Sequence, residues 1–384
     1  MRLVLTSRLA AVAVTAATAI TVVGQTASAV PPGGDGRPFP GPLHAISTVA
    51  STVPANGDQN PYGAALVEKN IGDLRRGNAL ISNFNNAGNQ QGAGTTLVQV
   101  GPKGTTRLFA QIDPQNLPGS CPGGVGLTTA LSILPGGWVV VGSLPTTDGT
   151  SATAQAGCLL VLDSHGKVRE TYSGQGINGP WDMTARSRGE KTDLFVTNVL
   201  NDTVAGGGDV MRQGTVLRIT LRTHDNRPPT RIATTEIGSG FAEKTDPTAL
   251  VIGPTGVGLR DGTLYVADTV DNRITAIPDA LTRRTSAGIG RVVTTDQHLN
   301  GPLGLAITPK GDILTVNGGD GNIVETTPRG AQVAARTLDT SGTPPGAGAL
   351  FGLAIAKNPN RVYFVDNATN TLNLLSRRRP LARG

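Results

Sequence analysis

The sequence predicts an all-β fold: a six-bladed β-propeller of four-stranded blades, in which an N-terminal strand completes the last blade. Three observations lead to this prediction: a composition typical of strands and turns, a strand pattern that recurs six times, and a spare strand at one end of the chain that matches a gap at the other. The 52 glycines and 26 prolines, with plentiful Thr and Val, indicate many short strands joined by turns.

The first 29 residues have the pattern of a cleaved signal peptide. Basic residues flank a short start, an apolar run covers about residues 9–23, and the small residues Ala-Ser-Ala at 27–29 form a cleavage site. The apolar run is too short and too rich in Ala and Thr to span a bilayer, so no transmembrane segment is expected. We therefore expect a secreted, extracellular protein cut after Ala29, with a Pro/Gly-rich linker at 30–43, the propeller at 44–376 and a basic tail at 377–384.

A repeated unit follows the predicted linker. Its first strand opens after a turn, in the segments "NPYGAALV" (from residue 60), "GLTTALSI" (126), "GPWDMTA" (179), "DPTALVI" (246), "GPLGLAI" (301) and "LFGLAI" (350). A second and a third strand come next in every unit, as in "LYVAD" and "RITAI" of the fourth. Aligned on Leu127, Pro180, Pro247, Pro302 and Leu350, the units are 53, 67, 55 and 48 residues apart, which is the range of propeller blades.

A fourth strand closes only the first five units, with segments such as "TRIATTEI" and "RVVTTD". The sixth unit runs directly into the basic tail. The segment "HAISTVAST", residues 44–52, precedes the first unit and resembles these outer strands. If it pairs with the sixth unit, the ring closes and two exposed sheet edges disappear.

The stretches "LYVADTVDNRI" and "GPLGLAITPKGDILTV" resemble NHL repeats, and the chain is similar to the NHL-like six-bladed propellers of secreted bacterial proteins. The resemblance is clearest in blades four to six. It implies the same fold, and that superfamily includes metal-dependent lactonases, lyases that act on peptide or cyclic substrates, and ligand-binding modules. A shared fold does not choose among these activities.

The second strands end on a polar residue in all six units, and in five of them this is Asn or Asp: Asn83, Ser143, Asn198, Asp268, Asn317 and Asp366. The favoured interpretation is turn chemistry, because Asn and Asp bond to their own backbone two residues on. The alternative is a divalent-cation site of oxygen ligands, suited to Ca²⁺. Its predicted ligands are Asp182, Asn198, Asp268 and Asp366.

One ionisable residue stands out among the first strands. The aligned positions are small or polar elsewhere, and only one is a carboxylate: Gly63, Thr129, Asp182, Ala249, Gly304 and Gly352. Asp182, which follows Trp181, could bind a cation, act as a base or cap a neighbouring backbone amide. Of the four histidines, only His298 stands just before a blade entry, so it is the predicted acid–base partner of Asp182 at the channel mouth.

The hairpins between second and third strands are long in blades one to three and short in blades four to six. Three neighbouring insertions on one face would build a rim over half of the channel mouth, where a rigid scaffold commonly carries binding residues. The predicted binding residues are Trp181 together with Asn85, Asn86, Asn201 and Asp202 of the rim. The alternative is that these Gly-rich insertions have no function.

The two cysteines, Cys121 and Cys158, fall in one repeat of a chain predicted to be exported, so we expect a structural disulfide between them. Removing Arg2 and Arg8 with the signal peptide lowers the formal charge from +6 to +4, and the remaining charges alternate in sign. With only 2 Trp, 4 Tyr and 7 Phe, this pattern disfavours nucleic-acid and large carbohydrate sites.

Two hypotheses of function remain at this stage. The first is a monomeric binding module for a small molecule or an extracellular protein, acting through the channel mouth and the rim. The second is a metal-dependent, lactonase-like hydrolase or lyase with Asp182 and His298 in acid–base roles. The scarcity of general bases favours the first hypothesis, and the lone carboxylate in a ring of small residues favours the second.

Overall fold

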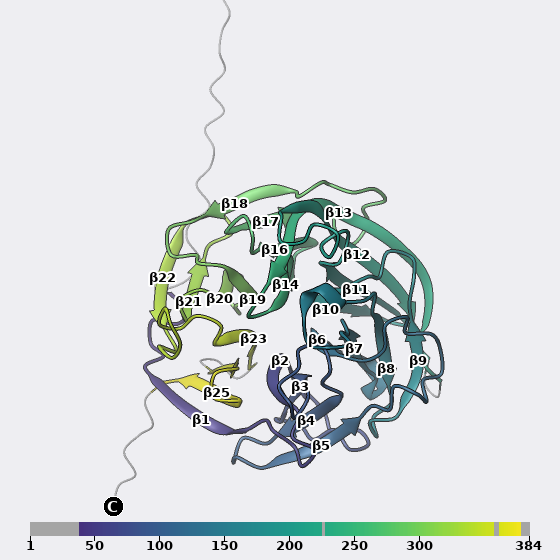
Figure 1. Cartoon of the computed structure of the whole chain (residues 1–384). Helices are drawn as coiled ribbons and strands as arrows, with labels where there is room; N and C mark the ends of the chain where they lie inside the picture. Colours follow the sequence, from purple (N-terminus) through teal and green to yellow (C-terminus); the bar gives the residue numbers. More distant parts are fainter. Residues whose placement is uncertain (1–37, 225–226, 357–360, 378–384) are drawn as a thin grey trace, which may run out of the picture. The chain divides into compact units, whose positions relative to one another are not determined.

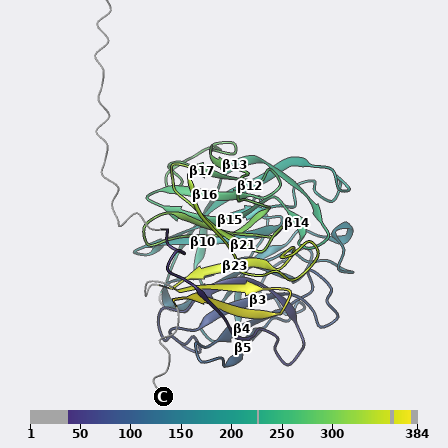
Figure 2. The ribbon, with the colours of Figure 1, turned by 90° about the vertical axis from the view of Figure 1, so that its left-hand side faces the viewer.

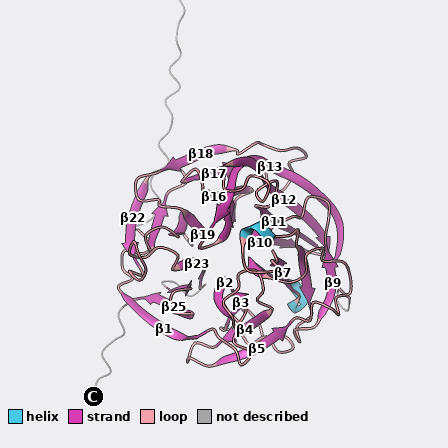
Figure 3. Cartoon of the chain, viewed as in Figure 1, coloured by secondary structure: helices cyan, strands magenta, loops and turns pink. Residues whose placement is uncertain are grey.

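The computed structural model describes residues 38–224, 227–356 and 361–377, and the predicted signal peptide lies outside them. The described residues form six antiparallel sheets arranged as a ring around a central axis (Figure 1), which Figure 2 shows edge-on. Among these residues, helix is confined to two 3-10 turns, η1 (Pro135–Gly137) and η2 (Ser151–Thr153), as Figure 3 shows. The fold is the predicted six-bladed propeller. No described helix is long and apolar enough to cross a membrane.

Each blade runs from an inner strand at the axis to an outer strand at the rim. Blade one contains β2 (Gln59–Leu66), β3 (Ala79–Asn85), β4 (Thr96–Val100) and β5 (Thr106–Gln111), and blade two contains β6 (Leu127–Ile133), β7 (Val139–Ser143), β8 (Cys158–Leu162) and β9 (Val168–Tyr172). Blade three contains β10 (Pro180–Arg188), β11 (Lys191–Asn198), β12 (Met211–Arg222), β13 (Thr230–Asp246) and β14 (Leu250–Ile252). Blade four contains β15 (Pro254–Arg260), β16 (Thr263–Asp268), β17 (Arg273–Ile277) and β18 (Arg291–Thr295), and blade five contains β19 (Pro302–Ile307), β20 (Ile313–Asn317), β21 (Asn322–Thr326) and β22 (Gln332–Thr337).

Blade six draws on both ends of the described chain. It contains β23 (Leu350–Ile355), β24 (Arg361–Asp366), β25 (Thr371–Ser376) and, as its outer strand, β1 (Ala45–Ser51). The antiparallel register of β1 and β25 runs from the pair Ala45–Ser376 to the pair Ser51–Thr371, so the predicted N-terminal closure is confirmed. Just before β1, Phe39 and Leu43 are buried against blades five and six, and the Phe39 amide donates to Glu325 Oε2 at 2.6 Å.

The second and third strands are buried on both faces because each blade packs against its two neighbours. Every residue of β8 is buried, for example, whereas β22 at the rim alternates between exposed and half-buried positions. Strands covered on both faces are expected to be continuously apolar, and strands with one face in solvent are expected to alternate between buried and exposed residues. The disulfide between Cys121 and Cys158 is confirmed, with Cα atoms 5.2 Å apart, and it joins the entry to blade two to that blade's third strand.

The sequence-based prediction for blade four is wrong in one respect. The segment from Asp246 to Ile252 does not provide the inner strand: β14 folds back on β13 and becomes a fifth strand of blade three. The inner strand of blade four is β15, which begins at the next proline, Pro254. Two prolines seven residues apart both fit the repeat, and β13 is long enough, at 17 residues, to absorb the first of them into a hairpin.

Candidate functional site

All six inner strands have an irregularity in their pairing with the second strand, at the equivalent position in each blade. Each pairs normally with the end of its second strand and then loses register over the next residues, as between Pro180 and Met183 of β10 and between Pro254 and Val257 of β15. The irregularity recurs in the other four inner strands, where register is lost after Pro61, Leu127, Pro302 and Leu350. The backbone between the two registers is thereby turned toward the neighbouring blade at the axis.

The residues at this irregularity form a ring around the axis: Gly63, Thr129, Asp182, Gly256, Gly304 and Gly352. Gly256 takes the place that the sequence alignment gave to Ala249, because Ala249 lies in the hairpin of blade three. A Cβ atom on Gly304 would overlap the carbonyl oxygen of Phe351, and one on Gly352 would overlap that of Tyr62. Close contact between blades therefore demands small residues, and Asp182 is the exception in the ring.

The face on which the inner strands begin is closed by packed aromatic rings. Tyr62, Phe84, Trp181 and Phe351 form this aromatic plug, with the Tyr62 ring 4.1 Å from that of Phe351 and 4.4 Å from that of Phe84 between centroids. The β13–β14 hairpin covers the plug, and the Trp181 indole donates from Nε1 to the Val251 carbonyl at 3.0 Å. Trp181, a predicted ligand-binding residue, is thus only 2% exposed.

The other side of the ring is open. A channel cavity of about 390 Å³ extends from Asp182 to the face on which the inner strands end. Its mouth is a collar of half-buried aliphatic side chains: Leu66, Ile133, Leu259, Ile307 and Ile355. Two ionisable residues, Asp182 and Glu68, are among the described residues that line it. The lining exposes more polar than apolar surface, and the volume lies in the range of small-molecule sites.

The Asp182 side chain is held by backbone groups of two blades. Its Oδ1 atom accepts the Met183 amide at 2.7 Å and its Oδ2 atom accepts the Val257 amide at 3.2 Å. The Asp182 backbone amide donates to Thr197 Oγ1 at 3.0 Å, and that hydroxyl donates in turn to the Thr255 carbonyl at 2.8 Å. Burial raises the pKa of Asp182 to about 7, although the two amide bonds act in the opposite direction.

His298 lies in a different part of the fold from Asp182. Its side chain is exposed, its amide donates to Gln332 Oε1 of the outer strand β22 at 2.8 Å, and its carbonyl accepts from Asn317 Nδ2 at 2.7 Å. These bonds fix His298 between the second and outer strands of blade five, whereas Asp182 belongs to the inner strand of blade three. The structure does not bring the predicted acid–base pair together.

The four predicted calcium ligands also have separate local partners. Asp182 accepts the two amides described above, Asn198 Oδ1 accepts the Asn178 amide at 3.2 Å, and Asp366 Oδ1 accepts the Thr369 amide at 3.1 Å. Asp268 forms an ion pair with Arg273 at 2.7 Å. Within the described ranges, no three His, Cys, Asp or Glu side chains are grouped as metal ligands would be. This donor set does not fit a shared Ca²⁺ ion. Turn chemistry accounts for Asp366, which accepts an amide of its own hairpin, whereas Asn198 bonds to the entry of its blade and Asp268 to Arg273.

The long loops of blades one to three lie on the closed face; those of blades one and two bond to each other, and that of blade three bonds to its own blade through the Asn201 amide and Glu243 Oε1. Thr146 of the blade-two loop donates its amide to the Gly92 carbonyl of the blade-one loop at 3.0 Å, and the Gln91 side chain reaches the Pro247 carbonyl at 3.0 Å. The predicted rim residues have local roles: Asn85 bonds to Asn89, Asn86 to Gln90 and Asn201 to Asn178, while Asp202 is an exposed turn residue with φ of 72°. Their part in ligand binding stays a prediction.

Sequence reasoning missed the plug and therefore chose the wrong face as open. Aromatic residues occupy the position before the ring residue in three blades, as Tyr62, Trp181 and Phe351. Bulky rings that converge on the axis of a narrow ring must fill it, so this recurrence was a usable signal in the sequence. Its counterpart is the run of aliphatic residues that end the inner strands and form the collar.

Comparison with known structures places the fold among propellers that include enzymes. A gluconolactonase of Xanthomonas campestris aligns with a TM-score of 0.51 and 13% identity over 86% of this chain and 89% of its own. The calcium-binding protein regucalcin of Agrobacterium tumefaciens gives 0.54 and 14% over 88% and 98%, and a luciferin-regenerating enzyme gives 0.54 and 12% over 88% and 96%. The chain shares their fold. The sequence matches no protein-family profile and no curated protein sequence.

Proposed function

We propose that the protein is a hydrolase or lyase that acts on a small molecule in the channel cavity, with Asp182 as its acid–base group. The observation that carries the proposal is a buried carboxyl, with a pKa raised to about 7, at the closed end of a cavity that opens to solvent. Perturbed carboxyls in clefts are typical of catalytic sites, because a general acid–base works best with a pKa near the operating pH.

The chemistry that suits one such carboxyl is the hydrolysis of an ester or lactone. Asp182 as a carboxylate would take a proton from water while the water oxygen attacks the carbonyl carbon. The protonated carboxyl would then return that proton to the alkoxide oxygen as the carbon–oxygen bond breaks, which gives an acid and an alcohol. The amides of Met183 and Val257 would hold the carboxyl in one orientation during both steps, and Thr197 Oγ1 would hold the Asp182 backbone through its amide.

The fold neighbours support an enzyme over a purely binding propeller, because a gluconolactonase and a luciferin-regenerating enzyme are among them. The regucalcin neighbour raises the question of calcium, but the predicted ligands do not fit a common ion and no step is assigned to one. The disulfide supports an oxidising compartment, in line with the predicted secretion.

A second candidate is binding of a small molecule without catalysis. It is favoured by the two backbone amides on Asp182, because a carboxyl that accepts one amide on each oxygen also serves as a cap between blades three and four. In that case the carboxyl would fix the ring geometry and the ligand would be held by the walls of the cavity.

The test is hydrolysis of a panel of γ- and δ-lactones and aryl esters by the mature chain and by Asp182→Asn. We expect a pH–rate profile that bends near pH 7 and a loss of about 10²–10⁴-fold in the variant, the usual contribution of a positioned acid–base group. Glu325→Gln is the matched control, since Glu325 is another buried carboxyl with a pKa raised to about 7 but does not line the cavity. Equal activity of the two variants would show that Asp182 is not the acid–base group, and no turnover of any substrate would leave the binding candidate.

A further inference from the structure

An apolar groove leads away from the collar between blades one and two. It has a volume of about 400 Å³ and adjoins the mouth of the channel cavity, because Leu66, Glu68 and Ile133 line both. Its apolar walls are Leu66, Val67, Ile71, Leu74, Ile133 and Leu134. Its volume lies within the range of ligand pockets, and it extends the surface that a ligand can contact from the mouth of the cavity over blades one and two.

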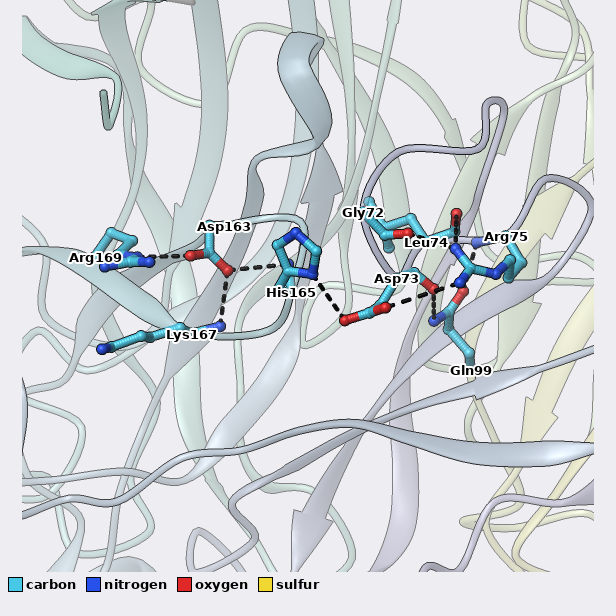
Figure 4. A network of polar contacts seen from close by, with 9 residues as sticks. All are labelled: Gly72, Asp73, Leu74, Arg75, Gln99, Asp163, His165, Lys167 and Arg169. Atoms are coloured by element: carbon cyan, nitrogen blue, oxygen red, sulfur yellow. Dashed lines mark hydrogen bonds and ion pairs between the residues drawn. The ribbon is translucent and has the colours of Figure 1, made fainter. Parts of the chain in front are cut away.

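The walls of this groove are fixed before any ligand arrives. One wall is the loop between β2 and β3, which the Asp73 amide ties to the Ser164 carbonyl of blade two at 2.8 Å. Figure 4 shows the polar network that continues this link: His165 Nδ1 lies 2.9 Å from Asp73 Oδ2, and Gln99 Nε2 donates to the Asp73 carbonyl at 2.9 Å. The opposite wall is the η1 turn, where Gly137 packs against Ile71. The groove is therefore part of the ring's rigid framework.

We propose that this groove binds the alkyl chain of an amphiphilic ligand whose polar end reaches Asp182. The position of the polar end rests on the proposed function, whereas the apolar walls of the groove and its position beside the cavity mouth support the position of the alkyl chain. Asp182 and the collar residue Leu66 are separated by three positions along equivalent inner strands, or roughly 10 Å at the rise of an extended strand. A short ligand fills that length, and a longer chain must turn at the collar.

Two features make the groove the path for that turn. An alkyl chain that leaves the cavity enters either the groove or solvent. Burying it in the groove is favoured, because each buried methylene raises the affinity about fourfold. The groove also begins at Leu66 and Ile133, which are adjacent members of the collar, so a chain that leaves the cavity there needs no opening of the protein. The proposed ligand class is accordingly a long-chain lactone, ester or alcohol.

The test measures binding of straight-chain alcohols, from 1-butanol to 1-decanol, to the mature protein by titration calorimetry. We expect affinity to rise about fourfold per methylene until the groove is filled. Ile71→Gln, which changes a residue of the groove that does not line the channel cavity, should weaken 1-decanol by tenfold or more and leave 1-butanol unchanged. Val333→Gln, the same kind of change at an exposed position of the outer strand β22, is the control and should change neither.

The two proposals fail in different ways. Affinities that do not depend on chain length, or Ile71→Gln binding 1-decanol as Val333→Gln does, would overturn the groove even if lactones are hydrolysed. Chain-dependent binding without any hydrolysis would retain the groove and overturn the proposed function. Thermal melting of each variant shows whether it is folded, and Ile71→Thr gives a smaller polar substitution at the same place in the groove wall if Ile71→Gln is not.

Discussion

Replacing Asp182 by Asn should flatten the dependence of stability on pH. The folded pKa of Asp182 is raised from 3.8 to about 7, so the folded protein binds this proton more tightly than the unfolded chain does. The contribution to stability is therefore fully present below about pH 4 and is lost as pH rises through about 7. A difference of about three pKa units corresponds to ~4 kcal/mol, spread over this window as ~1.4 kcal/mol per pH unit.

The assay is urea unfolding at intervals between pH 4.5 and 7.5, with the free energy of unfolding plotted against pH for both proteins. Glu243 and Glu325, whose pKa values burial raises to about 7, fall in the same window, as does Asp268 with a pKa raised to about 6. The slope of unfolding free energy against pH in the wild type is therefore the sum of the contributions of these carboxyls. The difference in slope between the wild type and Asp182→Asn gives the contribution of Asp182 alone. We expect the slope to fall by ~1.4 kcal/mol per pH unit in Asp182→Asn. Parallel curves would refute the reasoning that a buried, protonated carboxyl stands in the ring.

Three further predictions concern the framework. Deleting Ala45 to Thr52 should sharply lower the melting temperature, because it removes β1 and exposes the edge of β25; a truncated protein that melts like the full one would contradict the closure. Replacing Cys121 and Cys158 by Ser should lower the free energy of unfolding by ~3–4 kcal/mol on the chain-entropy account, measured in urea, and both cysteines should resist alkylation until reduced. Chelator should leave the melting temperature unchanged, since the predicted ligands are engaged elsewhere; a drop, with metal found by elemental analysis, would show that a cation stabilises the fold.

Local signals in the sequence were sufficient for the architecture but not for the site. The strand repeat, the outer strand at 44–52 and the cysteine pair each depend on patterns within a short stretch, and the structure confirms them. The inner strand of blade four was misplaced because two prolines fit the repeat, and only the pairing of β14 with β13 decides between them. The residue pattern of a short segment does not show which strand that segment pairs with.

The site depends on long-range packing that no single stretch encodes. Which face of the channel is open follows from three aromatic rings that come from three different blades and meet at the axis. The role of Asp182 depends on an amide of Val257 in the next blade. The sequence predicts His298 at the channel mouth because it precedes a blade entry. In the structure, the segment between blades four and five places His298 beside the outer strand β22.

The pairing of β1 with β25 has a consequence for how the chain reaches its native state. The contact between Ala45 and Ser376 joins residues from opposite ends of the folded region, so it has the largest sequence separation of any strand pairing in the ring. Blades one to five can assemble from neighbouring segments, but the sixth cannot be completed until β25 has been synthesised. Pairings of high contact order form late and slowly. The ring therefore stays open until residues 45–51 and 371–376 meet, whatever the order in which the other blades form.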